Sequence, residues 1–114
     1  MATTKKVAAH YILLPGCPLL KNGIVTWTTG EKPRVEVNVH PGKELQGVEF
    51  HAGMIVAERV REQIRDWQPG DSLVKRVEHL YAAGEESTRA LAIIQGADWK
   101  RLAWTGRTII TKIT

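Results

Sequence analysis

Four histidines are the residues of this chain that most readily bind metal ions or shuttle protons. They stand far apart in the sequence, at His10, His40, His51 and His79. No two of them are two or four residues apart, so the chain lacks the His-x-His and His-x-x-x-His pairs that place two metal ligands on one strand or helix. We therefore expect no metal ion and no other cofactor. Distant histidines brought together by the fold remain the alternative.

Cys17 is the only cysteine, and it lies in the turn-forming sequence Pro15-Gly16-Cys17-Pro18. A nucleophilic cysteine needs a nearby base or a helix N-terminus to lower the pKa of its thiol. No helix is predicted to begin there, which favours an unreactive loop thiol. The sequence also contains no dinucleotide-binding glycine motif, no Walker A loop and no Gly-x-Ser-x-Gly elbow. These patterns argue against an enzyme.

The tryptophans are the second group of candidate ligand contacts, since an exposed indole can stack on a base or a sugar. Trp67 belongs to an apolar stripe with helical spacing, which favours burial. Trp99 and Trp104 stand near Lys100 and Arg101, so they are the better candidates for exposure. Packing in the core or in an interface is the alternative for both. We keep these two tryptophans and the four histidines as candidate ligand or interface residues.

The chain carries a formal net charge of +4, from sixteen basic and twelve acidic residues. The two signs are interleaved, as in the sequence ERVRE at 58–62, which is typical of solvated surfaces rather than of a nucleic-acid-binding patch. We therefore expect no nucleic-acid partner. Such a partner would have to bind through basic residues of the middle segment with an affinity that falls steeply with salt; those residues are Arg59, Arg61, Arg65, Lys75 and Arg76.

The first ten residues lack the long apolar core of a signal peptide. No stretch of the chain approaches the roughly 18 apolar residues of a membrane span. We therefore expect a cytoplasmic protein that does not bind membranes.

The hydrophobic patterns predict strands at both ends of the chain and helices between them. Short apolar or alternating runs predict strands at 7–14, 23–29, 34–39, 48–51, 54–56, 89–95 and 106–114. The spacing of Val56, Val60, Ile64 and Trp67 predicts one helix that ends before Pro69. A second helix is predicted from Asp71, as its N-cap, to Gly84.

These elements predict one α+β domain spanning 1–114. Its strands fall within 1–56 and 89–114, and its two helices fall within 57–84. We expect a mostly antiparallel β-sandwich or curled sheet of six to seven strands. The two amphipathic helices are inserted between the N-terminal and the C-terminal strands.

Two segments near the start of the chain are HYILLPG at 10–16 and LKNGIV at 20–25. They look like the first strand and the NGxV turn of the small β-sandwich, or composite domain, of metal-dependent amidohydrolases. GMIVAE at 53–58 is similar to the segment that leads into the family's catalytic barrel. AIIQGADWKRL at 92–102 is similar to the segment that returns to the sandwich.

The departures from that family are as informative as the likeness. Ala57 and Glu58 replace the family's Pro-Gly, and Gln63 and Arg65 stand where its metal-binding His-x-His would be expected. Residues 57–87 are also too few for a (β/α)₈ barrel, which needs about 200–250 residues. The resemblance thus implies an accessory domain without its catalytic partner, and no catalytic or metal-binding residue carries over.

Loss of a barrel would expose apolar surface, and an exposed apolar patch generally marks an interface. We therefore expect a non-catalytic interaction or assembly domain that forms a homodimer or binds another protein. The alternative is a hydrolase-like, small-ligand-binding or metal-binding protein whose site lies at a subunit interface.

Overall fold

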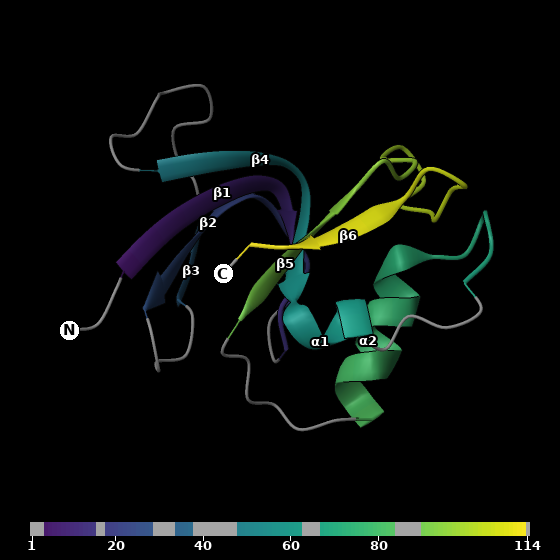
Figure 1. Ribbon diagram of the computed structural model, residues 1–114, viewed down its shortest axis with the longest axis horizontal. Coiled ribbons are helices and arrows are strands. Elements are labelled where there is room, and N and C mark those ends of the chain that lie inside the picture. Colours follow the sequence, from purple (N-terminus) through teal and green to yellow (C-terminus); the bar gives the residue numbers. More distant parts are fainter. Residues whose placement is uncertain are drawn as a thin grey trace.

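A computed structural model describes residues 4–15, 18–28, 34–37, 48–62, 67–83 and 90–113. The described strands form one mixed sheet in the order β3-β2-β1-β4-β5-β6 (Figure 1). They are β1 (Thr4–Ile12), β2 (Leu20–Thr28), β3 (Arg34–Val37), β4 (Val48–Ala57), β5 (Leu91–Gln95) and β6 (Ile109–Lys112). The two helices are α1 (Glu58–Glu62) and α2 (Leu73–Ala83).

This arrangement confirms the predicted α+β class. The described chain has six strands, and its two helices lie between β4 and β5. β1 and β4 run parallel, while the other four neighbouring pairs are antiparallel. A β-sandwich would require two sheets, and the described strands lie in one. The terminal strands β3 and β6 do not pair with each other, so this sheet is open.

β4 is longer than the sequence pattern predicts. It joins the two expected strands at 48–51 and 54–56, and it includes Ala57, which was expected to lie in the helical part of the chain, 57–84. Val56 and Ala57 pair with Ala92 and Leu91 of β5. The hydrogen bonds of this ladder override the helical spacing of the side chains, so α1 begins only at Glu58. Residues 63–66 of the expected helix lie outside the described residues.

A row of irregular backbone positions crosses the middle of the sheet. The register between β1 and β4 slips between Ala9 and Tyr11, and β4 contributes one extra residue there. Gly53, beside the slip on β4, has a φ of 140°. Asn22, at the same level on β2, has a φ of 53°. A left-handed residue and an extra residue both interrupt the regular pleat, which increases the local bend of a strand.

The bend gathers side chains from both ends of a strand into one core. Val7 and Ile12 differ in parity and would point to opposite faces of a regular strand. Both are nevertheless buried in the same hydrophobic cluster, together with Val25 and Ile55. β1 therefore changes face by one residue across the irregular row. Figure 1 shows that β1 and β4 curve sharply along their length.

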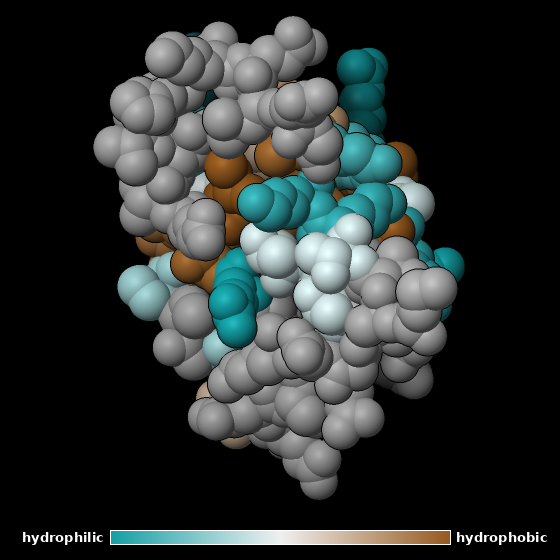
Figure 2. Space-filling model, turned by 90° about the vertical axis from the view of Figure 1, so that its left-hand side faces the viewer, coloured by the Kyte–Doolittle hydropathy of each residue, from teal (hydrophilic) through white to brown (hydrophobic). Residues whose placement is uncertain are grey.

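We call the cluster inside the bend the inner cluster and the one beneath the helices the outer cluster. The inner cluster buries Val7, Ala9, Ile12, Leu14, Val25, Ile55, Leu91 and Ile93. The outer cluster buries Leu13, Met54, Val56, Val60, Leu73, Val77, Ala92 and Ile94. Figure 2 shows the face at the left of Figure 1. Among the coloured residues of that face, hydrophobic side chains lie beside polar ones.

α2 packs by one face, as its sequence spacing predicts. Leu73 and Val77 are fully buried in the outer cluster, while Lys75, Arg76 and Glu78 are exposed. This division follows the period of 3.6 residues expected of an amphipathic helix. Neither helix of the described chain is long and apolar enough to span a membrane.

Candidate functional site

The three candidate histidines that the structure describes lie on three different elements. His10 lies exposed on β1, His51 lies on β4, and His79 lies exposed on α2. His40 lies outside the described residues. Among the residues that the structure describes, no group of three or more His, Cys, Asp or Glu side chains could hold a metal ion.

His51 instead belongs to a small ion-pair network on β1 and β4. The Glu49 Oε2 atom lies 3.1 Å from Lys5 Nζ and 3.4 Å from His51 Nε2. These two neighbours, Lys5 first, hold the pKa of the Glu49 carboxyl below its ordinary value of 4.5. The Glu49 side chain is more than half exposed, at 56%, so solvent screens the pairing and it contributes little to stability.

Trp99 and Trp104 are half-buried and pack against the outer cluster. The ring of Trp99 stacks on Tyr11 of β1, with the ring centroids 5.8 Å apart. Trp104 meets Trp67 edge to face at 5.1 Å. Both rings thus hold the loop after β5 onto the helical side of the sheet, which matches the packing alternative for these residues.

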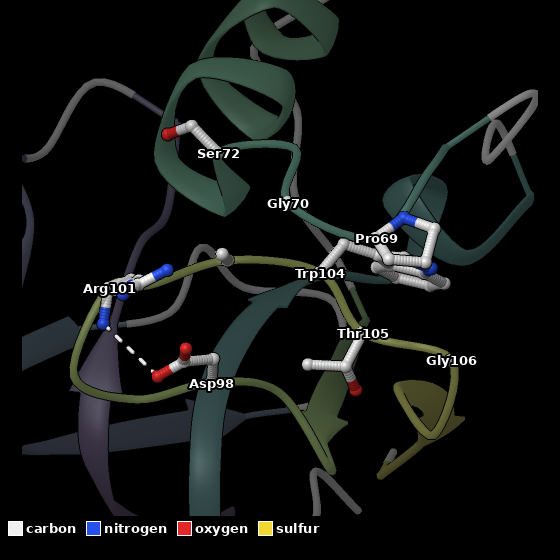
Figure 3. Close-up of a pocket in the computed structure, with 9 residues that line it drawn as sticks. Pro69, Gly70, Ser72, Asp98, Arg101, Trp104, Thr105 and Gly106 are labelled. Atoms are coloured by element: carbon white, nitrogen blue, oxygen red, sulfur yellow. Dashed lines mark hydrogen bonds between the residues drawn. The ribbon is translucent and has the colours of Figure 1, made fainter.

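A shallow cleft lies between the segment before α2 and the loop after β5. It has a volume of about 340 Å³. Figure 3 shows Ser72 at the first turn of α2, Arg101 and Asp98 on one side, and Trp104 with Pro69 on the other. The lining residues are Pro69, Gly70, Ser72, Asp98, Arg101, Ala103, Trp104, Thr105 and Gly106.

The side chains of Ser72 and Asp98 in this cleft already bond to the local backbone. The Ser72 hydroxyl accepts a hydrogen bond from the Lys75 N–H at 3.3 Å and caps α2. The Asp98 carboxylate accepts the Arg101 N–H at 3.3 Å, drawn as a dashed line in Figure 3. An Asx turn of this kind stabilises a tight loop. The cleft is therefore a structural junction between α2 and the loop.

The N-cap of α2 is Ser72 rather than the predicted Asp71. The Asp71 carboxylate instead accepts the Gln68 N–H at 2.8 Å and a hydrogen bond from Arg76 Nη2 at 2.9 Å. The backbone bond from Gln68, more than the Arg76 charge, holds the pKa of Asp71 below its ordinary value of 3.8. Asp71 thus fastens the turn before α2 and leaves the cap to its neighbour.

The Tyr81 hydroxyl bonds to backbone groups of two neighbouring segments of the sheet. In a parallel ladder, the Leu13 N–H bond to Ile55 O, which is 2.9 Å long, would be followed by a bond from Ala57 N–H to Leu13 O. The Tyr81 hydroxyl stands in place of that second bond. It accepts the Ala57 N–H at 3.0 Å and donates to the Leu13 carbonyl at 2.5 Å.

The surroundings of Tyr81 keep its hydroxyl in the donating form. Burial raises the pKa of Tyr81 above its ordinary value of 10.0, so the phenol stays protonated. The Arg59 guanidinium lies 5.2 Å from the centre of the Tyr81 ring. Its Nε and Nη2 atoms are buried without a hydrogen-bond partner among the described residues. The aromatic face thus compensates part of the cost of burying this cation.

β6 is one of the two edge strands of the described sheet. Ile113 N–H donates to Leu91 O of β5 at 2.8 Å. Since the direction of bonding alternates along an antiparallel strand, Thr111 also bonds toward β5, whereas the N–H and C=O groups of Ile110 and Lys112 point away from it. No described strand pairs with that edge.

Ile109, the first residue of β6, is 56% exposed. Among the described residues it is one of two large hydrophobic side chains with such exposure, the other being Phe50 on β4 at 60%. The opposite edge of the sheet, β3, carries the charged residues Arg34 and Glu36 in its sequence RVEV. β6, with the sequence IITK, has one charged residue and is the more apolar edge. Since charged residues discourage pairing at a sheet edge, β6 is also the less protected of the two.

Neither Tyr81 nor Ile109 is singled out by its sequence context. Tyr81 occurs in an apolar helical stripe and Ile109 in a β-branched run, and both patterns are typical of ordinary core residues. Comparisons with protein-family models, curated proteins and solved structures found no match for this chain.

Proposed function

We propose that this protein is a non-catalytic assembly domain that associates with a second copy of itself through the edge strand β6. The exposed Ile109 at an unpaired, mainly apolar strand edge carries this proposal. Unpaired N–H and C=O groups at a sheet edge form a template for another strand, and apolar side chains beside them favour its docking.

The protection that sheet edges commonly carry is weak on β6. The strand IITK contains no proline, and Lys112 is its only charged residue. The Nζ atom of Lys112 lies 3.6 Å from Glu58 Oε1 of α1. This ion pair offsets only part of the Lys112 charge, because the Lys112 side chain is 53% exposed.

The expected dimer is concentration-dependent. A pair of four-residue strands buries less surface than the roughly 1,200 Å² of a standard stable interface. We therefore expect a dissociation constant on the order of 10 μM, corresponding to about 7 kcal/mol. The fraction of protein in the dimer then rises with the protein concentration.

Substitution of Lys112 tests the role of this edge, because its N–H points away from β5. Lys112→Pro removes that N–H and sets a proline ring on the edge, yet it leaves the hydrogen bonds to β5 in place. We expect Lys112→Pro to weaken dimerisation at least about tenfold, since an interfacial hydrogen bond and close approach are both lost. Sedimentation velocity from low micromolar to several hundred micromolar protein measures the change.

Lys112→Ala is the matched control for the proline variant. It also removes the ion pair with Glu58, but it keeps the backbone N–H. We expect Lys112→Ala to dimerise nearly as the unaltered protein does. A protein that remains monomeric over the whole range, or a proline variant that dimerises as strongly as the alanine variant, would contradict the proposal.

We further infer that the domain is related to the accessory sandwich of the amidohydrolases. This is supported by the points at which the chain leaves and re-enters the sheet. Ala57 pairs with Leu91, and Glu58 N–H donates to Ala90 O at 3.0 Å. An inserted segment of any length can begin and end at such neighbouring points. In this chain α1 and α2 occupy the position of the family's barrel, and α2 covers the outer cluster.

A further inference from the structure

The backbone directions of β6 restrict how two copies could pair. Within the described strand, only Ile110 and Lys112 direct N–H and C=O groups to the free edge. In an antiparallel pair, two residues that bond to each other exchange both hydrogen bonds. A two-fold axis adds that a contact from one residue to another is repeated in reverse.

Three symmetric registers bring these outward groups together, and two of them are unfavourable. Pairing Lys112 with Lys112 of the second copy sets two like charges opposite each other, which is destabilising. Pairing Ile110 with Ile110 of the second copy brings Lys112 opposite Thr108. The Thr108 N–H already donates to Thr105 O at 3.2 Å, so it is not free to bond to Lys112 of the second copy. The third register pairs Ile110 with Lys112 of the second copy and satisfies all the outward groups of both strands.

On this basis, and resting on the proposed self-association, we propose that two β6 strands pair antiparallel around a two-fold axis at Thr111. The pairing forms four backbone hydrogen bonds between Ile110 and Lys112 of the two copies. It joins the two six-stranded sheets into one continuous sheet across the dimer.

The side chains of β6 complement themselves in this register. On the inner-cluster face, Ile109 lies opposite Ile113 of the second copy. Ile113 packs against the inner cluster of its own chain, so the exposed Ile109 gains an apolar neighbour. On the other face, Ile110, which packs against the outer cluster, lies opposite Lys112 of the second copy. No two like charges face each other.

Thr111 meets Thr111 of the second copy at the axis as a non-hydrogen-bonded pair. The Cβ atoms of such a pair are about 4.5–5.5 Å apart. Thr111 is exposed in the single chain, so the position accepts a charged side chain without disturbing the core. A charge at this position faces its own copy in the symmetric dimer, which makes it a direct probe of the register.

The test compares Thr111→Glu, Thr111→Lys and their equimolar mixture by sedimentation velocity. We expect each variant alone to dimerise at least about tenfold more weakly than the unaltered protein, because like charges stand directly opposite. We expect the mixture to recover the unaltered affinity or exceed it, because a carboxylate then faces an ammonium group. The same pair of substitutions at Thr4, exposed on β1, should leave dimerisation unchanged.

The outcomes separate this register from the proposed function. If the unaltered protein dimerises but the mixture is no tighter than either variant alone, the register is wrong and self-association stands. If the unaltered protein does not dimerise, both fail. Thermal unfolding of each variant verifies its fold.

A cross-linking measurement covers the case in which a charged variant fails to fold. With Cys17→Ser as background and oxidised glutathione as the oxidant, Thr111→Cys should form a disulfide-linked dimer, since its Cα atoms meet across the axis. Ile109→Cys, which faces position 113 of the second copy, should not. Equal cross-linking of the two variants would overturn the register.

Discussion

Gly53→Ala is expected to lower the free energy of unfolding by about 3–5 kcal/mol, which combines backbone strain with overpacking. Gly53 has a φ of 140°, a conformation that residues with a Cβ rarely adopt. A Cβ built there would lie 2.1 Å from the Ile94 carbonyl oxygen of β5. That oxygen belongs to the neighbouring strand, so β4 and β5 would have to separate. For a domain of this size the expected loss is about 12–20 °C in Tm.

Two other glycines provide controls for this substitution. A Cβ on Gly106 would have no neighbour within 4 Å, so Gly106→Ala should change the free energy of unfolding by less than about 0.5 kcal/mol. Gly70 also has open space but a φ of 97°, so Gly70→Ala should cost only the backbone strain, about 1 kcal/mol. A Gly53→Ala protein that unfolds at the temperature of the Gly106→Ala protein would contradict the bend described at β4.

Tyr81→Phe is expected to lower the free energy of unfolding by about 2–4 kcal/mol, because two buried backbone groups lose their partner. The phenol ring and its packing remain. Only the hydroxyl that links Ala57 N–H to the Leu13 carbonyl is lost. Chemical denaturation measures the loss, and hydrogen exchange at the Ala57 amide should become faster at the same time.

Tyr11→Phe is the matched control for the Tyr81 substitution. Tyr11 is also half-buried and stacks on Trp99, but its hydroxyl has no hydrogen-bond partner among the described residues. We expect this variant to unfold within about 0.5 kcal/mol of the unaltered protein. Equal stability of Tyr81→Phe and Tyr11→Phe would show that the inserted hydroxyl does not hold β1 to β4.

The elements of this fold that depend on local patterns could be predicted from the sequence. The alternation of Val35 with charged neighbours located β3, and the spacing of Leu73 and Val77 located α2 and its buried face. Val56 shows where local spacing is ambiguous. It belongs both to an apolar strand run and to a helical stripe in the sequence. Pairing with Ala92 places it in a strand, because ladder hydrogen bonds to a distant segment outweigh a weak local preference.

The candidate site could not be predicted from the sequence, because it depends on which strand lies at the edge of the sheet. Ile109 occurs in the same kind of β-branched run as the buried Ile93 and Ile94. Only the strand order distinguishes an edge position from a central one. Tyr81 likewise acts on Leu13, which lies 68 residues away in the chain. No pattern within a helix reveals a contact at that separation.

Backbone amide exchange at Ile110 and Lys112, measured by NMR at several protein concentrations, tests the central claim most directly. In a single chain these N–H groups point away from β5 and no described strand pairs with them, whereas in the proposed dimer they donate to the second copy. We predict that their exchange slows as the concentration rises. The Thr111 amide, which bonds toward β5, should stay protected throughout. Exchange at Ile110 and Lys112 that is rapid and independent of concentration, while Thr111 remains protected, would contradict assembly through β6.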